Sequence, residues 1–200
     1  RDVLVGTAGD DVIDGRALED ELHGGLGNDV VIGGSEDDLL FGEADDDTLV
    51  GGSEDDSLDG GDGNDLLLGG FGQDVIAGGA GSDTISYQGE FARFRIDLSA
   101  AAGAGGVRQV LSDRNPDTGA ELAAFAVEDT YTGIENVTGG ESDDAITGDG
   151  NANVLRGRAG NDTIRGLDGD DIIDGGDGTD DLSGGAGNDI IDGGDDNDTI

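Results

Sequence analysis

A nine-residue period runs through two long stretches of this sequence and restricts the folds that are open to it. Nine consecutive nonamers run from Gly6 to Ser86, and seven more run from Gly139 to Ile200, where the last is one residue short. The first position is Gly and the eighth is aliphatic in all sixteen units, and the sixth is Asp in all except the unit that carries Asn153. A period this strict indicates a structural repeat.

The composition of the nonamer predicts the local structure. The three residues around each eighth position predict a short strand with one side chain inward and two outward. The six residues before them, rich in Gly and Asp, predict a turn in which glycine supplies positive φ. Two units then close a coil of 18 residues, and stacked coils form two parallel sheets across a thin aliphatic seam. The predicted fold is all-β: a parallel β-roll, or β-solenoid, in two blocks over 6–86 and 139–200, interrupted by a mostly β or irregular insertion over 87–138.

The charge of the chain indicates what holds such coils together. Acidic residues outnumber basic ones 48 to 9, which gives a formal net charge of −39. One aliphatic side chain in nine residues is too small a core to offset chain entropy, and stacking would place the acidic residues in columns. A cation between the turns is therefore expected. Carboxylates and main-chain carbonyls are hard oxygen donors, which suit calcium better than zinc, or than magnesium with its tightly held waters.

The same composition argues against several functions. The negative charge repels the phosphate backbone, so nucleic acid is not an expected partner. No apolar run approaches the roughly 18 residues of a membrane-spanning helix. The absence of Cys excludes disulfides and fits an extracellular location. His23 is the only His, so neither a Ser–His–Asp nor a Cys–His site is expected beyond it, and the chain is predicted not to be an enzyme.

Units such as GGDGNDLLL, GGAGSDTIS and GGAGNDIID resemble the hemolysin-type calcium-binding repeat of RTX proteins, over 6–86 and 139–200. The resemblance implies a structural, calcium-binding β-roll module of a secreted bacterial protein, exported by type I secretion machinery and folded by extracellular calcium. Two alternatives stay open: the repeat region of an adhesin or surface-layer protein, and the non-catalytic C-terminal module of a secreted protease, lipase or polysaccharide-modifying enzyme. Because the chain opens at Arg1 and stops within a repeat at Ile200, a fragment of a longer protein is expected.

The resemblance also implies where the ions bind. One ion lies between the turns of units i and i+2. The earlier turn provides its second- and fourth-position carbonyls and its Asp, and the later turn its first- and third-position carbonyls and its Asp. In the first run the implied sets are Gly25, Gly27 and Asp29 with Gly42, Ala44 and Asp47, and Gly61, Gly63 and Asp65 with Gly78, Ala80 and Asp83. In the second run they are Arg158, Gly160 and Asp162 with Gly175, Asp177 and Asp180; Leu167, Gly169 and Asp171 with Gly184, Ala186 and Asp189; and Gly176, Gly178 and Asp180 with Gly193, Asp195 and Asp198. Further candidate ligands are Asp11, Asp38, Asp56 and Asp74.

The number of units limits the number of ions, and some departures lower it. Nine units allow seven i,i+2 pairs and seven units allow five, so at most about twelve calcium ions are expected. Leu18, Glu36 and Glu54 replace the fourth-position Gly on one edge of the first block. Because such residues disfavour positive φ, weaker or absent ions are expected there, unless the Glu carboxylates themselves bind. Asn153 lacks the carboxylate, which puts any site that uses it in doubt.

The insertion departs from the repeat but keeps some β character. Residues 91–98, FARFRIDL, alternate like a strand, whereas 100–106 is typical of a flexible connector and 113–119 of a turn. Counting back from the second block, residues 130–138 are expected to form an atypical rung with Val137 at its eighth position. A structural cap or spacer is the predicted role, and a surface for a ligand or partner is the alternative.

One face of the first block is predicted to be apolar on the outside. The units that begin at residues 24, 42 and 60 fall on the same sheet, and their seventh and ninth positions point away from the seam. Exposed apolar stripes of this kind usually mark a contact, so we expect the insertion, another domain or another copy to dock here. The stripe comprises Val30, Thr48 and Leu66 at the seventh positions and Ile32, Val50 and Leu68 at the ninth.

Overall fold

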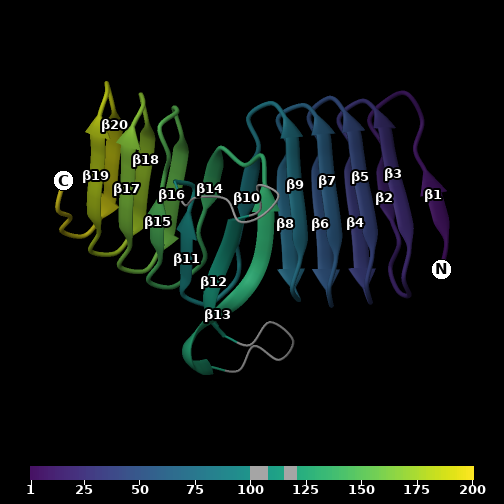
Figure 1. Ribbon diagram of the computed structural model, residues 1–200, viewed down its shortest axis with the longest axis horizontal. Coiled ribbons are helices and arrows are strands. Elements are labelled where there is room, and N and C mark those ends of the chain that lie inside the picture. Colours follow the sequence, from purple (N-terminus) through teal and green to yellow (C-terminus); the bar gives the residue numbers. More distant parts are fainter. Residues whose placement is uncertain (100–107, 115–120) are drawn as a thin grey trace. The chain divides into compact units, whose positions relative to one another are not determined.

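The computed structural model describes the backbone of residues 1–99, 108–114 and 121–200 and the side chains of residues 1–99 and 129–200. All regular elements of this part of the chain are strands (Figure 1), and it contains no helix long and apolar enough to cross a membrane. The strands are β1 (Val3–Val5), β2 (Val12–Asp14), β3 (Glu21–Leu26), β4 (Val30–Ser35), β5 (Leu39–Ala44), β6 (Thr48–Ser53), β7 (Ser57–Asp62), β8 (Leu66–Phe71), β9 (Val75–Ala80), β10 (Thr84–Ser86), β11 (Phe94–Asp97), β12 (Arg108–Arg114), β13 (Glu121–Thr132), β14 (Asn136–Thr138), β15 (Ala145–Thr147), β16 (Val154–Ala159), β17 (Thr163–Asp168), β18 (Ile172–Asp177), β19 (Asp181–Ala186) and β20 (Ile190–Asp195).

Strands one coil apart in the repeat blocks pair in parallel, with a register of 18 residues. On one sheet Val31 lies opposite Leu49, and Leu49 lies opposite Leu67. A typical strand such as β4 holds the last three residues of one nonamer and the first three of the next. The strands are thus longer than the three residues predicted, and each turn is shorter. The predicted parallel β-roll is confirmed.

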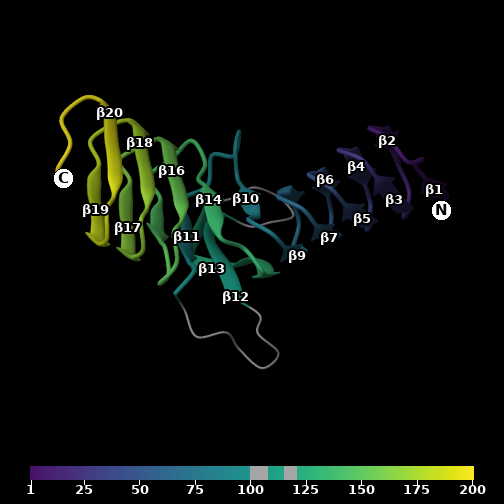
Figure 2. The same cartoon turned by 90° about the horizontal axis from the view of Figure 1, so that it is seen from above.

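Two compact units divide the chain. The N-terminal unit comprises Arg1–Ile85 and Val127–Ile134, and the described part of the C-terminal unit comprises residues 86–99, 108–114, 121–126 and 135–200. Within the N-terminal unit, β1, β3, β5, β7, β9 and the end of β13 form one sheet, and β2, β4, β6, β8 and β10 form the other. Within the C-terminal unit, β12, β11, β15, β17 and β19 belong to one sheet and β14, β16, β18 and β20 to the other. Figure 2 shows the two sheets as two layers within each unit, with β12 in the layer of the odd-numbered strands.

The core of each coil is the aliphatic side chain at the eighth position. Leu22, Val31 and Leu40 are completely buried between the two sheets. Burial of one such side chain contributes roughly 1.5–3 kcal/mol, and each coil contributes only two. Ile200, in the last coil, is 71% exposed.

The insertion contributes a rung to the C-terminal unit. In this unit β11 pairs in parallel with β15, so that Ile96 lies opposite Ile146, and antiparallel with β12. The strand predicted over 91–98 is therefore present as β11. Tyr87 and Phe94 are buried beside it, with ring centroids 4.2 Å apart.

The end of the insertion supplies inward side chains to both units. In the N-terminal unit, Tyr131 of β13 lies opposite Ile76 and is buried. In the C-terminal unit, Val137 of β14 lies opposite Leu155 and is also buried. The connector predicted over 100–106 lies outside the described residues, and so does most of the turn predicted over 113–119.

The outward stripe of the N-terminal unit lies on β4, β6 and β8. The register places Val30, Thr48 and Leu66 in one row and Ile32, Val50 and Leu68 in a second. Leu66 is 37% exposed and the other five are half-buried. The docking role of this stripe stays a prediction.

Candidate metal-binding turns

Most turns of the two repeat blocks share one backbone conformation, which does not depend on glycine alone. The second-position residue has positive φ in thirteen of the sixteen turns. Gly25 and Gly61 have φ values of 114° and 103°, and Arg158 and Leu167 have values of 84° and 82° at the same position. A non-glycine residue in this region is held there by its surroundings. The stacked coils therefore impose the turn on sequences that disfavour it.

A ladder of hydrogen bonds fixes one oxygen of each sixth-position carboxylate. The backbone N–H of Asp29 donates to Asp47 Oδ1 at 2.7 Å, and the N–H of Asp47 donates in turn to Asp65 Oδ1 at 2.8 Å. Each bond joins residues 18 apart, and so links neighbouring coils. These bonds place the columns of Asp side chains inside the turns.

The second oxygen of most of these carboxylates has no donor. Burying a charged oxygen without a partner costs free energy that a bound cation would offset. Such an array of oxygens inside a protein requires an explanation. The Oδ2 atoms that are buried without a hydrogen-bond partner include those of Asp20, Asp29, Asp38, Asp47, Asp56, Asp65, Asp74, Asp162, Asp171 and Asp180.

The first-position glycine marks where two oxygens from successive coils converge. A Cβ placed on Gly24 would lie 2.6 Å from Asp29 Oδ2 and 2.8 Å from the carbonyl oxygen of Gly42. A Cβ on Gly175 would likewise meet Asp180 Oδ2 and, at 2.6 Å, the carbonyl oxygen of Gly193. The invariant glycine therefore keeps open the space that both oxygens face.

Burial makes these carboxyl groups weaker acids than an exposed Asp. It raises the pKa of Asp47 and of Asp65 to about 6, and that of Asp56 and of Asp162 to about 7. The hydrogen bond from the preceding coil lowers each pKa, and neighbouring acidic residues raise it again. Without a cation, these groups therefore ionise less readily in the folded state than in an unfolded chain.

The donor set fits calcium. Among the described residues no three acidic or His side chains come together as a metal site. Main-chain carbonyl oxygens of the turns are available to a cation in addition to these carboxylates. Mixed carboxylate and carbonyl coordination is characteristic of calcium, whereas zinc prefers Cys and His.

All five implied ligand sets consist of turns that the structure brings together, one coil apart. The third-position carbonyls of Ala80, Asp177 and Ala186 lie at the preceding turn, since they accept hydrogen bonds of 2.9, 3.0 and 3.0 Å from the N–H groups of Gly63, Gly160 and Gly169. The register pairs Gly25 with Glu43 and Leu26 with Ala44, Gly61 with Gly79 and Asp62 with Ala80, Arg158 with Gly176 and Ala159 with Asp177, Leu167 with Gly185 and Asp168 with Ala186, and Gly176 with Gly194 and Asp177 with Asp195. The sixth-position hydrogen bonds run from Asp29 to Asp47, Asp65 to Asp83, Asp162 to Asp180, Asp171 to Asp189 and Asp180 to Asp198.

Two of the additional candidates have other surroundings. Asp11 Oδ2 accepts hydrogen bonds from the backbone and hydroxyl of Thr7, at 2.6 and 2.8 Å, and these bonds lower its pKa. Asp74 lies beside a second buried carboxylate, Asp129, whose Oδ1 accepts the Asp74 N–H at 2.9 Å. Burial first, and then the charge of Asp129, raise the pKa of Asp74 to about 9. The segment that pairs with the Asp74 unit on this side is the strand β13, Glu121–Thr132, and not a turn of the nonamer repeat.

Asp20 is a further candidate site residue, which the sequence analysis did not name. Its unit, GRALEDELH, lacks Gly at the second and fourth positions, yet Leu18 has a φ of 80° and Asp20 is only 2% exposed. The sequence signal for Asp20 is its place at the sixth position of its unit. Glu36 and Glu54 also have positive φ, at 72° and 78°. The substitutions on this edge therefore leave the turn conformation intact, and weaker binding there stays a prediction.

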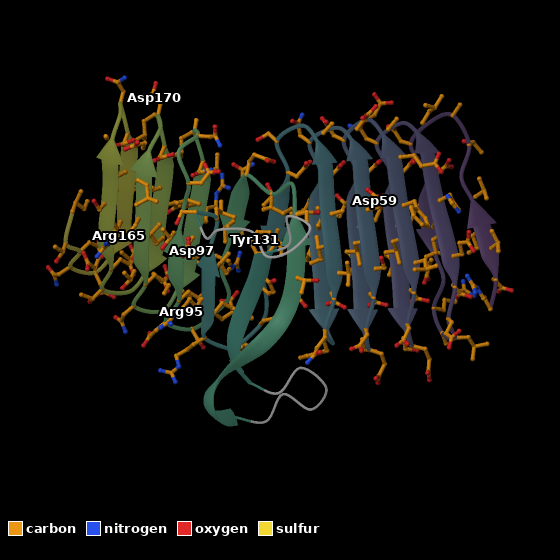
Figure 3. All side chains as sticks on the ribbon, viewed as in Figure 1. Asp59, Arg95, Asp97, Tyr131, Arg165 and Asp170 are labelled. Carbon is orange, nitrogen blue, oxygen red and sulfur yellow. The ribbon has the colours of Figure 1, made fainter. Side chains whose placement is uncertain are left out.

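A second ladder at the fifth position was also missed. The backbone N–H of Asn64 donates to Asp46 Oδ1 at 2.8 Å, and that of Asn188 donates to Asp170 Oδ1 at 2.8 Å. This ladder runs in the opposite direction to that of the sixth position, since here the later residue donates. Asp170 lies in a turn at the end of its coil (Figure 3). The sequence signal for this ladder is the frequent occurrence of Asp and Asn at the fifth position of the nonamer.

Comparison with protein families gives a match to the RTX calcium-binding nonapeptide repeat (4 copies). The matched stretches are residues 1–31, 15–49, 23–58, 50–85, 129–164, 147–182 and 174–200, which together cover well over half of the chain. Comparison with curated proteins gave no match. Since sequence repeat, solenoid fold and donor set agree, the chain belongs to the RTX calcium-binding nonapeptide repeat family.

Proposed function

We propose that this chain is a structural calcium-binding module of a secreted bacterial protein, and that its folding is coupled to calcium binding. The column of buried Asp Oδ2 atoms without hydrogen-bond donors carries the proposal. Each of these oxygens needs a positive partner, and each belongs to a turn rather than to a catalytic cleft.

The ligands proposed are the five sets implied by the sequence. In the best-matched set, the carbonyls of Gly61 and Gly63 and the carboxylate of Asp65 would hold the ion with the next turn in the same column. That next turn supplies the carbonyls of Gly78 and Ala80 together with Asp83. When bound, calcium supplies the positive charge and the oxygen coordination that the turn lacks.

Charge balance supports coupling between binding and folding. Twelve divalent ions, the upper limit, would reduce the net charge from −39 to about −15. Without ions the folded chain suffers strong self-repulsion. Ions that bind only the folded state stabilise it, by about 2.7 kcal/mol per site when free calcium is 100 times the dissociation constant.

Secretion supplies the change in calcium concentration. Affinities of about 10⁻⁴–10⁻³ M are typical of extracellular calcium modules. At such affinities the chain would stay loose in a calcium-poor cytosol, pass through a type I secretion system and fold outside. In a longer secreted enzyme or adhesin, this module would be non-catalytic.

Calcium titration followed by far-UV circular dichroism tests the proposal, with magnesium as the control ion. We expect little β-structure in chelator, a cooperative gain with calcium and a much smaller response to magnesium. Equal β-structure in chelator and in calcium would contradict coupled folding. Isothermal titration calorimetry on the same samples then counts the ions.

A further inference from the structure

In one section of the C-terminal unit, hydrogen bonds within the protein satisfy the polar atoms of the sixth-position side chains. Both oxygens of Asp144 accept hydrogen bonds, Oδ1 from the N–H of Phe94 at 2.7 Å and Oδ2 from the N–H of Gly140 at 2.8 Å. Gly140, the second residue of this turn, does not have positive φ. The turn therefore directs an N–H at the carboxylate oxygen that most turns leave without a donor.

Asn153 provides the same result in the next turn by a different bond. Its Oδ1 accepts the N–H of Asp149 at 2.8 Å, and its Nδ2 donates to the carbonyl oxygen of Glu135 at 2.7 Å. Glu135 and Asn153 are 18 residues apart, so this amide ties two coils together. A neutral amide is the side chain that can both accept and donate here, and it needs no positive partner.

Aromatic packing reinforces this section from the insertion. Tyr87 and Phe94 are both 1% exposed. The ring of Phe94 lies against the turn, since a Cβ on Gly140 would be 3.1 Å from its Cε2 atom. The Tyr87 N–H donates to the carbonyl of Thr138 at 3.0 Å. Two buried aromatic rings contribute considerably more burial than the single aliphatic side chain of an ordinary nonamer.

The charge of this section is also lower than that of the turns after it. Residues 87–98 and 135–156 together carry seven acidic and three basic residues, a net charge of −4. Residues 157–200 carry thirteen acidic and two basic residues, a net charge of −11. Self-repulsion in the absence of ions is therefore weaker in the section that holds Asn153.

We propose that residues 87–98 and 135–156 form a calcium-independent section of the β-roll, ordered before ions bind, on which the coils of residues 157–200 assemble. The inference rests on the proposed function in that it takes the later turns to require calcium. In a solenoid each coil contacts only its neighbours, so folding can start at one coil and propagate. If the first coil is already ordered, folding avoids its most costly step, which is the formation of a coil that has no ordered neighbour.

The bonds that would propagate the order are in place. The N–H of Asp144 donates to Asp162 Oδ1 at 2.7 Å, and the N–H of Asn153 donates to Asp171 Oδ1 at 2.8 Å. An ordered section therefore presents two oriented donors to the carboxylates of the next two turns. Ions would then bind at turns that already have one neighbour in position.

Hydrogen–deuterium exchange of the full chain, in chelator and in calcium, tests the proposal. We expect slow exchange over residues 135–156 in both conditions, and slow exchange over residues 166–198 only in calcium. Fast exchange of both segments in chelator would overturn the inference while leaving calcium-coupled folding intact. Slow exchange of both segments in chelator would overturn the coupling itself, and with it the inference.

Substitution of Asn153 tests the role of its amide, with Asn151 as the control. Asn153→Asp replaces the donor to Glu135 by a carboxylate oxygen, so residues 135–156 should exchange at least tenfold faster in chelator and regain protection in calcium. Asn151→Ala alters an exposed residue of the same turn, whose amide donates to the Asp149 carboxylate, without placing a second carboxylate beside it. It should leave the protection in chelator unchanged. Unaltered protection of Asn153→Asp in chelator would overturn the inference, and its recovery in calcium shows that the variant folds.

Discussion

The turn over residues 60–65 and the turn over residues 148–153 have the same length, but their sixth-position side chains differ in charge and in hydrogen bonding. In the first, burial raises the pKa of Asp65, and its Oδ2 has no donor. In the second, Asn153 uses both ends of its amide in hydrogen bonds. The two turns thus differ in whether hydrogen bonds within the protein satisfy the sixth-position side chain. The same backbone repeat can contain both kinds of turn.

Removal of calcium should produce the largest difference between these two kinds of turn. In excess chelator, most β-structure of residues 15–83 should be lost, because their buried carboxylates repel one another and lack partners. Return of calcium to about 10 mM, well above the affinity of extracellular sites, should restore it. Far-UV circular dichroism measures the change. Retention of the full signal in chelator would show that turns whose Asp Oδ2 has no donor fold without a cation.

A methyl group in the space between the two oxygens should have the next largest effect. Gly24→Ala places a Cβ 2.6 Å from Asp29 Oδ2. Overpacking of this kind costs about 1–3 kcal/mol, and the variant should also bind one ion fewer. Gly9→Ala is the matched control, because its Cβ would meet nothing within 4 Å. Thermal unfolding and calorimetry in calcium measure both effects. Equal behaviour of the two variants would contradict the assignment of the site.

Removal of a single carboxylate should have opposite effects with and without calcium. Asp65→Asn removes a ligand, so in calcium it should lower stability by about 1–3 kcal/mol. In chelator, where residues 15–83 should have little β-structure, the same change removes a charge that the fold would bury, so far-UV circular dichroism should show equal or greater β-structure. Asp59→Asn, on the exposed face of β7 (Figure 3), is the control and should change stability little in either condition. Less β-structure in Asp65→Asn than in the parent chain in chelator would show that the carboxylate supports the fold without a cation.

The pH dependence should also change sign with calcium. Burial raises the pKa of Asp56 and of Asp162 to about 7 in the folded state, above the value of about 3.9 in an unfolded chain. Their protonation therefore favours the fold below about pH 4, and this contribution is lost as the pH rises through 6 to 7. In chelator the chain should be more ordered at pH 5 than at pH 8. In calcium the order should be reversed, because ligation requires ionised carboxylates. Circular dichroism at both pH values, with and without calcium, measures the effect.

The fifth-position ladder should give the smallest effect. Asn64→Ala removes the side-chain bond to Asp46 and the acceptor for the Ser82 N–H. The loss should be about 0.5–1.5 kcal/mol, in calcium as measured by thermal unfolding. Gln73→Ala is the control, because it keeps the backbone N–H bond to Asp55 Oδ1. A much larger loss of bound calcium in Asn64→Ala would show that this ladder also positions ligands.

Periodic residues made most of the fold predictable. Gly at the first position, Asp at the sixth and an aliphatic residue at the eighth were enough to predict the 18-residue coil, the parallel sheets and the inward seam. The residues that broke the pattern were harder to place. Leu18 was expected to disfavour its turn, yet neighbouring coils hold it at positive φ. Asp20 was missed for the same reason, because the rest of its unit departs from the repeat.

The sequence by itself determined the repeat, the coil and the kind of cation, because these depend on the spacing and chemistry of residues that recur every nine positions. The tertiary structure decided which carboxylate oxygens have donors. That choice depends on contacts between residues far apart in the chain, such as the N–H of Phe94 at Asp144 and the carbonyl of Glu135 at Asn153. A local pattern cannot contain such contacts, since they exist only once coils are stacked.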